Sequence, residues 1–304
     1  MVFPSNDDMI KQIMLTSSII WKRELNKKDV ESWLSNFKGE VFSIEKERKL
    51  ALWLLLNFVY YNTDEVKHLC NTLYNDFIHA ILEKEHFKNG KEVKKYYDKV
   101  LSSTRFFDLG RKSESSGFVL YFFRQENQLP IENFISDPKN LNGDVKNIVY
   151  VDDVTLSKGT NNQARKYLDK DRERYEFDDK NIFLITFIAT KQSKEILEKV
   201  GYKVISCITL GKENKCFSSE SIVFHQFPEH KDDCMELASH YGKQIYSAHP
   251  LGWKDGQYMF GFFYNTPNNT LPIFWCENNG WKPILKRYQK KYTTQEYAKL
   301  ERFV

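Results

Sequence analysis

The sequence predicts an α/β fold with a doubly wound parallel sheet, an N-terminal helical region and a C-terminal extension. In the middle of the chain, three apolar runs of strand length alternate with two polar stretches of helix length. A long segment with helical periodicity precedes them, and a segment rich in turn-forming residues follows. Strands that alternate with helices build βαβ units with right-handed crossovers, so this order favours a parallel sheet.

The predicted strands are nearly continuous in apolar residues and span residues 147–154, 182–189 and 202–210. Strands buried on both faces of a parallel sheet read in this way, without alternation of polar and apolar residues. The helices between them are predicted over residues 161–175 and 191–200, and Gly201 stands where the second one needs a C-terminal cap.

The N-terminal part has the spacing of helices. Between Asp29 and Lys95 there is no proline, and apolar residues recur at intervals of three and four. The run 50–61 is predicted as a buried helix, and the triplet that starts at Asn62 as the cap of the next helix, with Glu65 in its first turn. We therefore predict three regions: a helical region at 1–98, the α/β core at 99–228, and a C-terminal hood or extension at 229–304.

Composition favours a globular, cytoplasmic protein. The net charge is +4, from 45 basic and 41 acidic residues, which is too small for a strong basic field. The five cysteines are scattered without a C-x-x-C pair, so neither a disulfide framework nor a zinc site is indicated. The longest apolar run is well short of the ~20 residues that cross a bilayer, and the acidic start is unlike a secretory signal. No membrane association is expected.

Two adjacent acids, Asp152 and Asp153, end the first apolar strand. Adjacent strand residues point to opposite faces, so the carboxylates are expected to have different tasks: one binds vicinal ribose hydroxyls, and the other acts through Mg²⁺ or a second hydrogen bond. The turn that follows leads into a helix and offers backbone N–H groups to a 5-phosphate. The predicted phosphate-binding residues are Thr155, Ser157, Lys158, Gly159 and Thr160. The alternative is an ordinary α/β loop.

A second polar loop, residues 108–117, contains two cations and several hydroxyl groups and leads into an amphipathic stretch at 118–125. We interpret it as a pyrophosphate loop, because the first turn of a helix presents N–H groups to an anion. A solvated surface loop is the alternative. The candidate pyrophosphate-binding residues are Gly110, Arg111, Lys112, Ser113, Ser116 and Gly117.

A third candidate segment, residues 265–275, combines turn-forming and apolar residues. Four of its polar side chains are candidates for a hood over a bound base or pyrophosphate: Asn265, Asn268, Asn269 and Thr270. The alternative is a structural turn in which the asparagines satisfy backbone groups while Phe274 and Trp275 lie in the core.

Residues 148–160 resemble the 5-phosphoribosyl-1-pyrophosphate (PRPP) signature of the type I phosphoribosyltransferases. The resemblance implies a type I phosphoribosyltransferase-like fold, with Asp152 and Asp153 holding ribose and, together with the ligand, Mg²⁺. Two positions depart from the family pattern. Leu156 stands where purine-salvage members usually carry an acidic residue that assists the base, and Lys158 stands where glycine is usual. These departures put a standard purine-salvage activity in doubt.

The two loops and residues 265–275 together resemble phosphoribosyltransferase-like proteins of bacterial conflict systems, some of which accompany retron reverse transcriptases. The likeness covers about residues 50–287 and implies an effector in anti-phage defence. It also implies partners: a reverse transcriptase with its msDNA or noncoding RNA, and a second copy of the chain in a homo-oligomer. A role beside nucleic acid rests only on this resemblance and on the basic stretch 282–291, which is more often a solvated face.

Two functions remain open at this point. The first is a Mg²⁺-dependent phosphoribosyltransferase or nucleotide-consuming enzyme that acts at the anomeric carbon of ribose. The second is a catalytically inactive subunit that senses PRPP or a nucleotide, or binds a partner, and it is favoured by Leu156 and Lys158.

Overall fold

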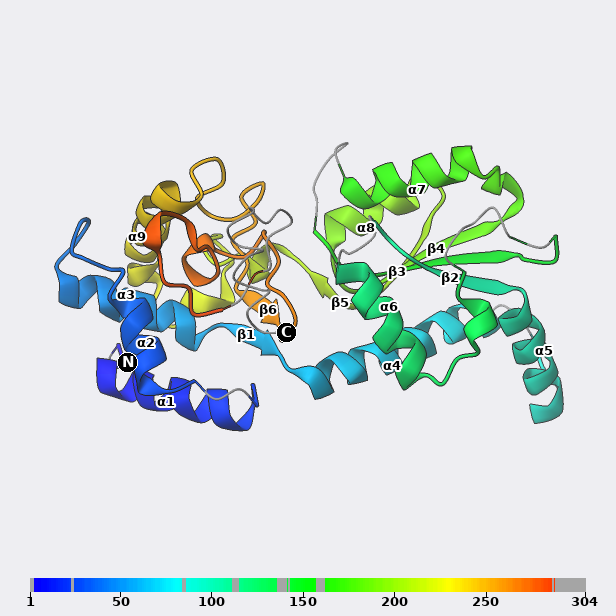
Figure 1. Cartoon of the computed structure of the whole chain (residues 1–304), viewed down its shortest axis with the longest axis horizontal. Helices are drawn as coiled ribbons and strands as arrows, with labels where there is room; N and C mark the ends of the chain where they lie inside the picture. The colour runs from blue at the N-terminus through cyan, green and yellow to red at the C-terminus, as the bar shows by residue number, and fades with distance from the viewer. Residues whose placement is uncertain are drawn as a thin grey trace, which may run out of the picture. The chain divides into compact units, whose positions relative to one another are not determined.

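The computed structural model describes residues 3–22, 25–83, 86–110, 115–135, 141, 143–156, 162–285 and 287. The chain forms two compact units (Figure 1). The first combines both ends of the chain, Met1–Tyr61 and Val223–Val304, and the second is Asn62–Ile222. Residues 62–98, which were predicted as part of the N-terminal helical region, lie in the second unit.

The second unit contains a four-stranded parallel sheet in the order β2-β3-β4-β5, so the predicted α/β class is confirmed. Its strands are β2 (Thr104–Asp108), β3 (Asn147–Thr155), β4 (Asn181–Thr190) and β5 (Lys203–Leu210). The last three correspond to the three predicted strands. Nearly every residue of β3 and β4 is buried, which explains why these strands read as apolar runs rather than as alternating patterns.

Helices cover both faces of this sheet (Figure 1). On one face, α7 (Gln163–Arg174) and α8 (Lys191–Glu198) pack on side chains that include Ile148, Tyr150 and Leu184. On the other, α4 (Thr63–Leu82) and α6 (Ser115–Glu126) bring Phe77 and Phe123 against the ring of Phe106. The chain therefore has the doubly wound arrangement that the sequence predicts.

Local signals in the sequence determine several helix ends. Asn62 caps α4 by accepting hydrogen bonds from the N–H groups of Asp64 and Glu65, while the Glu65 carboxylate accepts from the N–H of Asn62. Gly201 has φ +92° after α8, a conformation that glycine adopts without strain. Both caps are confirmed predictions.

One further helix, α5 (Gly90–Ser102), precedes the first strand of the sheet.

In the described part of the first unit, four α-helices surround an aromatic core. They are α1 (Asn6–Ile19), α2 (Lys27–Leu34), α3 (Ile44–Leu56) and α9 (Lys231–Ile245). The ring of Trp33 stacks on Phe274 with centroids 5.7 Å apart, and its indole N–H donates to the carbonyl of Ile273 at 2.8 Å. This contact joins the two ends of the chain.

The run 50–61 is not one helix. The helix α3 ends at Leu56, and residues 59–61 form strand β1 (Val59–Tyr61), which pairs in parallel with β6 (Phe260–Phe262). Valine and tyrosine favour strands, and the pairing partner lies about 200 positions away in the sequence. A short apolar run does not reveal such a partner, which is why helical periodicity alone gives the wrong assignment here.

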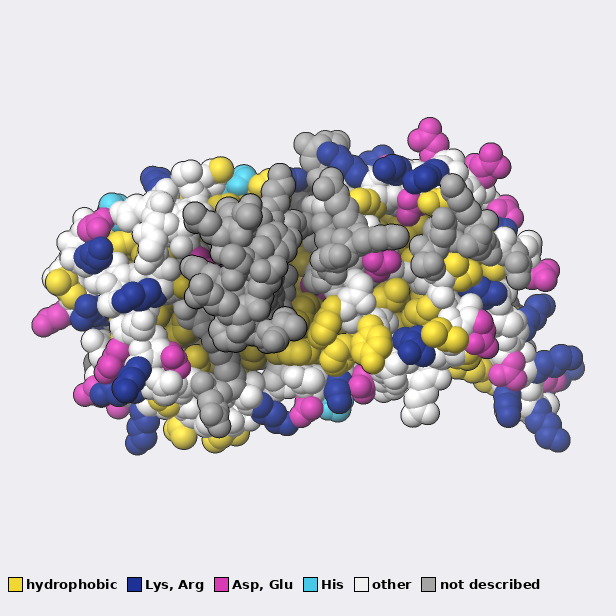
Figure 2. Space-filling view, in the orientation of Figure 1, with side chains coloured by type: hydrophobic (Ala, Val, Ile, Leu, Met, Phe, Trp, Pro, Cys, Tyr) yellow, Lys and Arg dark blue, Asp and Glu magenta, His cyan; other side chains and the backbone are white. Residues whose placement is uncertain are grey.

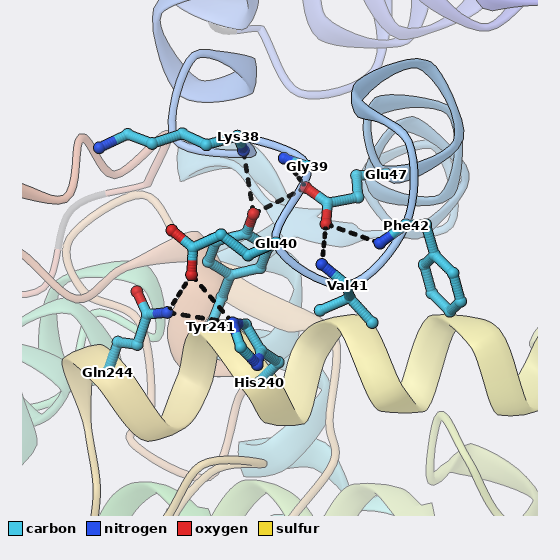
Figure 3. Close-up of polar contacts among 9 residues, drawn as sticks. All are labelled: Lys38, Gly39, Glu40, Val41, Phe42, Glu47, His240, Tyr241 and Gln244. Carbon is cyan, nitrogen blue, oxygen red and sulfur yellow. Dashed lines mark hydrogen bonds and ion pairs between the residues drawn. The ribbon is translucent and has the colours of Figure 1, made fainter.

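Figure 3 shows how a buried carboxylate organises the loop before α3. The Glu47 side chain is fully buried and accepts hydrogen bonds from the backbone N–H groups of Gly39, Val41 and Phe42, at 2.7–3.1 Å. The hydroxyl of Tyr241, on α9, donates to the same carboxylate at 2.7 Å. Glu47 therefore joins a loop and two helices of the first unit.

Three global expectations can be compared with the structure. Of the helices in the described part of the chain, none has both the length and the apolar content needed to cross a membrane. All five cysteines are free. On the face drawn in Figure 2, the basic and acidic side chains of the described residues are interspersed, in agreement with the nearly balanced charge of the sequence.

Candidate functional site

The chain reverses its direction across the sheet between β2 and β3. After β2, the chain passes through α6 on one face, and Phe134 then forms a parallel bridge with Phe106 of β2. Since Phe106 also pairs with Val149 of β3, Phe134 lies on the opposite edge of β2. The chain then returns to β3, and β4 and β5 continue in the other direction. Open α/β sheets bind ligands at such switch points, outside the carboxyl ends of the strands.

The acidic pair lies at this carboxyl end of β3. Asp153 is buried, whereas Asp152 is half-buried, and alternation along the strand places them on opposite faces of the sheet. Each carboxylate accepts a hydrogen bond from the backbone N–H of the next residue. The distances are 2.9 Å for Asp153 N to Asp152 Oδ1, and 2.8 Å for Val154 N to Asp153 Oδ1. These short local bonds fix both side chains at the strand end.

A third carboxylate, Asp108, comes from the neighbouring strand. Asp108 pairs with Val151, and the N–H of Leu109 donates to the carbonyl of Val151 at 3.3 Å, so Asp108 lies one pairing position before Asp152. A Cβ atom at Gly117 would lie 3.8 Å from the Asp108 carboxylate, so this carboxylate is also close to the first turn of α6. Asp108 begins the predicted pyrophosphate loop, but the sequence alone assigns it no role. The position of Asp108 as the last residue of a strand is the signal that indicates a role in the site.

The candidate pyrophosphate loop connects β2 to α6. Gly110 has φ +134°, which favours glycine at this position. Ser116, in the first turn of α6, is only 1 % exposed, and its Oγ has no hydrogen-bond partner in the described part of the chain. A buried hydroxyl without a partner is unusual in a folded protein. Three predicted residues of this loop, Arg111, Lys112 and Ser113, lie outside the described residues.

The candidate phosphate turn connects β3 to α7. Thr155 is buried and is the last residue of β3, paired with Ala189 of β4. Asn162 caps α7 by accepting from the N–H of Arg165, and its amide also donates to the Ser193 hydroxyl at 2.6 Å. The chain thus passes from the acidic pair to a fixed helix N-terminus. Between these points, Ser157, Lys158, Gly159 and Thr160 lie outside the described residues.

Comparison with known families agrees with this arrangement. Residues 30–287 match the PRTase-CE family, which is most of the chain. The chain belongs to the PRTase-CE family. It is therefore a phosphoribosyltransferase-like protein, as the resemblance of residues 148–160 implies. No curated protein and no solved structure matches the chain.

One of the two residues at which the motif departs from purine-salvage enzymes is buried in the PRTase-CE chain. Leu156 is 5 % exposed, directly after β3. Its side chain is part of the apolar interior, so no acidic group stands at this position to exchange a proton with a base. Any reaction at this site must proceed without that group.

The candidate hood residues belong to the first unit of the PRTase-CE chain, and two of them are bound to its backbone. The Asn269 amide donates to the carbonyl of Trp253 at 3.1 Å, and the Thr270 hydroxyl donates to the carbonyl of Phe260 at 2.7 Å. Both side chains are buried, whereas Asn265 and Asn268 are half-buried. Phe274 and Trp275 lie in the core, as the structural alternative expects.

The donor set of the PRTase-CE chain fits a cation that arrives with its ligand. Among the described residues, no group of three or more His, Cys, Asp and Glu side chains is arranged to hold a metal ion. Mg²⁺ is commonly bound through one or two carboxylates, with waters and substrate phosphates in the other positions. Asp152 and Asp153, on opposite faces of the strand, can each supply one such carboxylate.

Proposed function

We propose that this PRTase-CE protein binds PRPP or a nucleotide at the carboxyl ends of β2 and β3 and acts at the anomeric carbon of the ribose. The observation that carries the proposal is the chain reversal at this edge of the sheet. It brings Asp108, Asp152 and Asp153 to one switch point, in a member of a phosphoribosyltransferase-like family.

In the proposed complex, Asp152 and Asp153 hold the ribose and, together with the ligand, Mg²⁺; the turn 156–160 holds the 5-phosphate, and Arg111 and Lys112 hold the pyrophosphate. The bond between the anomeric carbon and the pyrophosphate breaks, and both electrons leave with the pyrophosphate. The acceptor then forms the new bond at that carbon. Fixed charges and positioning favour this step, because negative charge grows on the leaving group and positive charge on the sugar.

Mg²⁺ supplies charge neutralisation for the pyrophosphate when it is bound with the ligand. The chain's own residues orient the sugar and the two phosphate groups. Ser116 has a hydroxyl group that is not used within the described protein, so it is available to a phosphate oxygen at the N-terminus of α6.

The second candidate function is a PRPP or nucleotide sensor that does not turn its ligand over. The burial of Leu156 favours it, because the acid/base group of purine-salvage enzymes is replaced by a core residue. A turnover assay for released pyrophosphate or lost nucleotide separates the two functions.

The biological setting is also part of the proposal. On the resemblance of the two loops and residues 265–275, we assign the protein to anti-phage defence in the cytoplasm. Its proposed partners there are a retron reverse transcriptase with its msDNA or noncoding RNA, and further copies of itself. Co-purification of the chain with the reverse transcriptase tests this assignment.

Thr160→Ala should weaken PRPP binding and leave the melting temperature nearly unchanged. A hydrogen bond to a charged phosphate is worth about 1.5 to 3 kcal/mol, so the loss of affinity should be roughly 10- to 100-fold. Isothermal titration with PRPP measures it. Unaltered affinity would show that the turn 156–160 does not hold the phosphate.

The double variant Arg111→Ala/Lys112→Ala should lose more affinity for PRPP than for a ribonucleoside 5-monophosphate, which has no pyrophosphate. Titration of both ligands gives the ratio. The control Lys94→Ala/Lys95→Ala makes the same change of charge on α5, where both side chains are exposed. Equal losses for the two ligands would indicate a general electrostatic effect and contradict the assignment of the loop.

A further inference from the structure

A cavity lies at the opposite end of the sheet from the candidate phosphoribosyl site, where the strands begin. Its volume is about 580 Å³, within the range of roughly 300–1,000 Å³ that is usual for small-molecule sites. Its lining includes Asn147, Asn181 and Lys203, which are the first residues of β3, β4 and β5. The candidate phosphoribosyl site lies at the carboxyl ends of β2 and β3, so the length of strand β3 separates the two sites.

A directed row of hydrogen bonds crosses the amino ends of the strands in this cavity. Lys203 Nζ donates to Asn181 Oδ1 at 2.8 Å, and Asn181 Nδ2 donates to Asn147 Oδ1 at 3.2 Å. Asn147 Nδ2 donates to Thr104 Oγ1 at 3.2 Å, and that hydroxyl donates to the carbonyl of Val100 at 2.7 Å. An ammonium group can only donate, so Lys203 determines the orientation of both amides.

The row leaves hydrogen-bonding positions open. An asparagine amide has two N–H groups and two acceptor positions on its oxygen, and within the described chain each amide uses one of each kind. Backbone bonds keep the row in place, because the N–H of Asn181 donates to the carbonyl of Lys146 at 2.9 Å. The cavity therefore presents fixed donors and acceptors side by side.

Charge and apolar surface complete the cavity. Three ammonium groups line it, from Lys99, Lys146 and Lys203, against the carboxylates of Glu83 and Glu198. Lys99 and Lys146 make no ion pair with any described residue, so their charges remain available to a ligand.

The inner surface is apolar and aromatic. Phe183, Val100 and Val204 are buried and line the same cavity, together with the ring of Tyr96. Such a surface accommodates the faces of a planar ring.

We propose that this cavity binds a small organic anion with a planar, hydrogen-bonding ring, of the chemical class of a nucleoside monophosphate, independently of the carboxyl-end site. The ring lies on the apolar surface and exchanges hydrogen bonds with the asparagine row, while the anionic group is held by Lys99 and Lys146. Such a ligand is positioned to act as an effector, because strand β3 contributes to both sites, with Asn147 at its amino end and the acidic pair at its carboxyl end.

The test uses the full chain with Asp152→Asn/Asp153→Asn, which separates this cavity from the proposed phosphoribosyl site. Isothermal titration with AMP, GMP, CMP and UMP should show that at least one of them binds with one site per chain. Adding Lys99→Ala/Lys146→Ala should lower that affinity at least about tenfold, since charge-assisted bonds are lost. Both lysines are exposed, so the melting temperature should not change.

Two controls make the result specific. In the same background, Lys94→Ala/Lys95→Ala removes two exposed lysines of α5 that do not line the cavity, and it should leave the affinity unchanged. Inorganic phosphate should bind more weakly than the best nucleotide. The proposal is overturned if no monophosphate binds, if the two lysine pairs have equal effects, or if phosphate alone binds as tightly as the nucleotide.

Discussion

Replacing both Asp152 and Asp153 with asparagine should remove the Mg²⁺-dependent part of PRPP binding, a loss of about 100-fold or more, while the fold stays intact. Each carboxylate loses one interaction of its charged oxygens with the bound ligand or its cation, and each such interaction is worth about 1.5 to 3 kcal/mol. The backbone bonds at this strand end use one Oδ1 atom of each side chain, and an asparagine Oδ1 accepts the same bonds. Titration with PRPP, with and without Mg²⁺, and a thermal melt measure the two effects.

The control for this variant is another adjacent acidic pair in the same unit. Asp178→Asn/Asp179→Asn removes two carboxylates whose side chains are 86 % and 73 % exposed and form only surface ion pairs. It should bind PRPP like the wild type. If Asp152→Asn/Asp153→Asn also binds PRPP as the wild type does in Mg²⁺, the two acids are only the end of a core strand.

The variant Asp152→Asn/Asp153→Asn also separates the enzymatic and the sensing functions. For an enzyme, it should abolish pyrophosphate release or nucleotide loss, together with any toxicity in cells. For a sensor, the wild type itself binds without turnover. Binding and turnover are measured on the same purified proteins, and toxicity is measured in cells.

Glu47→Gln should destabilise the first unit by about 3 kcal/mol. The glutamine amide would place its own N–H groups against buried backbone donors, and an unsatisfied buried donor costs about 1 to 3 kcal/mol. At about 2 to 4 °C per kcal/mol, the melting temperature should fall by about 6 to 12 °C. All six tryptophans lie in the first unit, so tryptophan fluorescence reports on the unfolding of that unit.

Two further variants make this prediction specific. Tyr241→Phe removes one bond to the same carboxylate and the bond that the hydroxyl accepts from the N–H of Lys38, so it should cost about 2 kcal/mol, less than Glu47→Gln. Glu45→Gln changes an exposed carboxylate in the first turn of the same helix and should have almost no effect. Equal effects of Glu47→Gln and Glu45→Gln would contradict the structural role of Glu47.

The contribution of Glu47 should depend on pH. Burial raises the pKa of this carboxyl, but the bonds from Tyr241 and from three backbone N–H groups outweigh it and lower the pKa below its ordinary value of 4.5. A group with a lowered pKa stabilises the folded state fully above its ordinary pKa, and the stabilisation is lost as the pH falls through the lowered value. The difference between wild type and Glu47→Gln should therefore shrink below about pH 4.5.

Strands β3, β4 and β5 were predictable because they are long, apolar and flanked by capped helices. Asn62 and Gly201 mark helix ends through chemistry that is local in the sequence, so no tertiary information is needed to find them. The acidic pair was found for a similar reason: it lies at the carboxyl end of a buried strand.

Features that depend on distant pairing were not predictable. The strand β1 pairs with β6, and the first unit joins both ends of the chain, although neither segment indicates its partner. The bridge between Phe106 and Phe134 is a single residue pair, too short to leave a pattern, yet it creates the switch point. The proximity of Asp108 to Asp152 follows only from the register of β2 and β3.

The central claim is that the carboxyl ends of β2 and β3 form a phosphoribosyl site, and isothermal titration of the wild-type chain with PRPP tests it most directly. We predict saturable binding of one PRPP per chain that is stronger in Mg²⁺ than in its absence, because the acidic pair needs the cation to tolerate the pyrophosphate. The absence of PRPP binding in Mg²⁺ would contradict the claim.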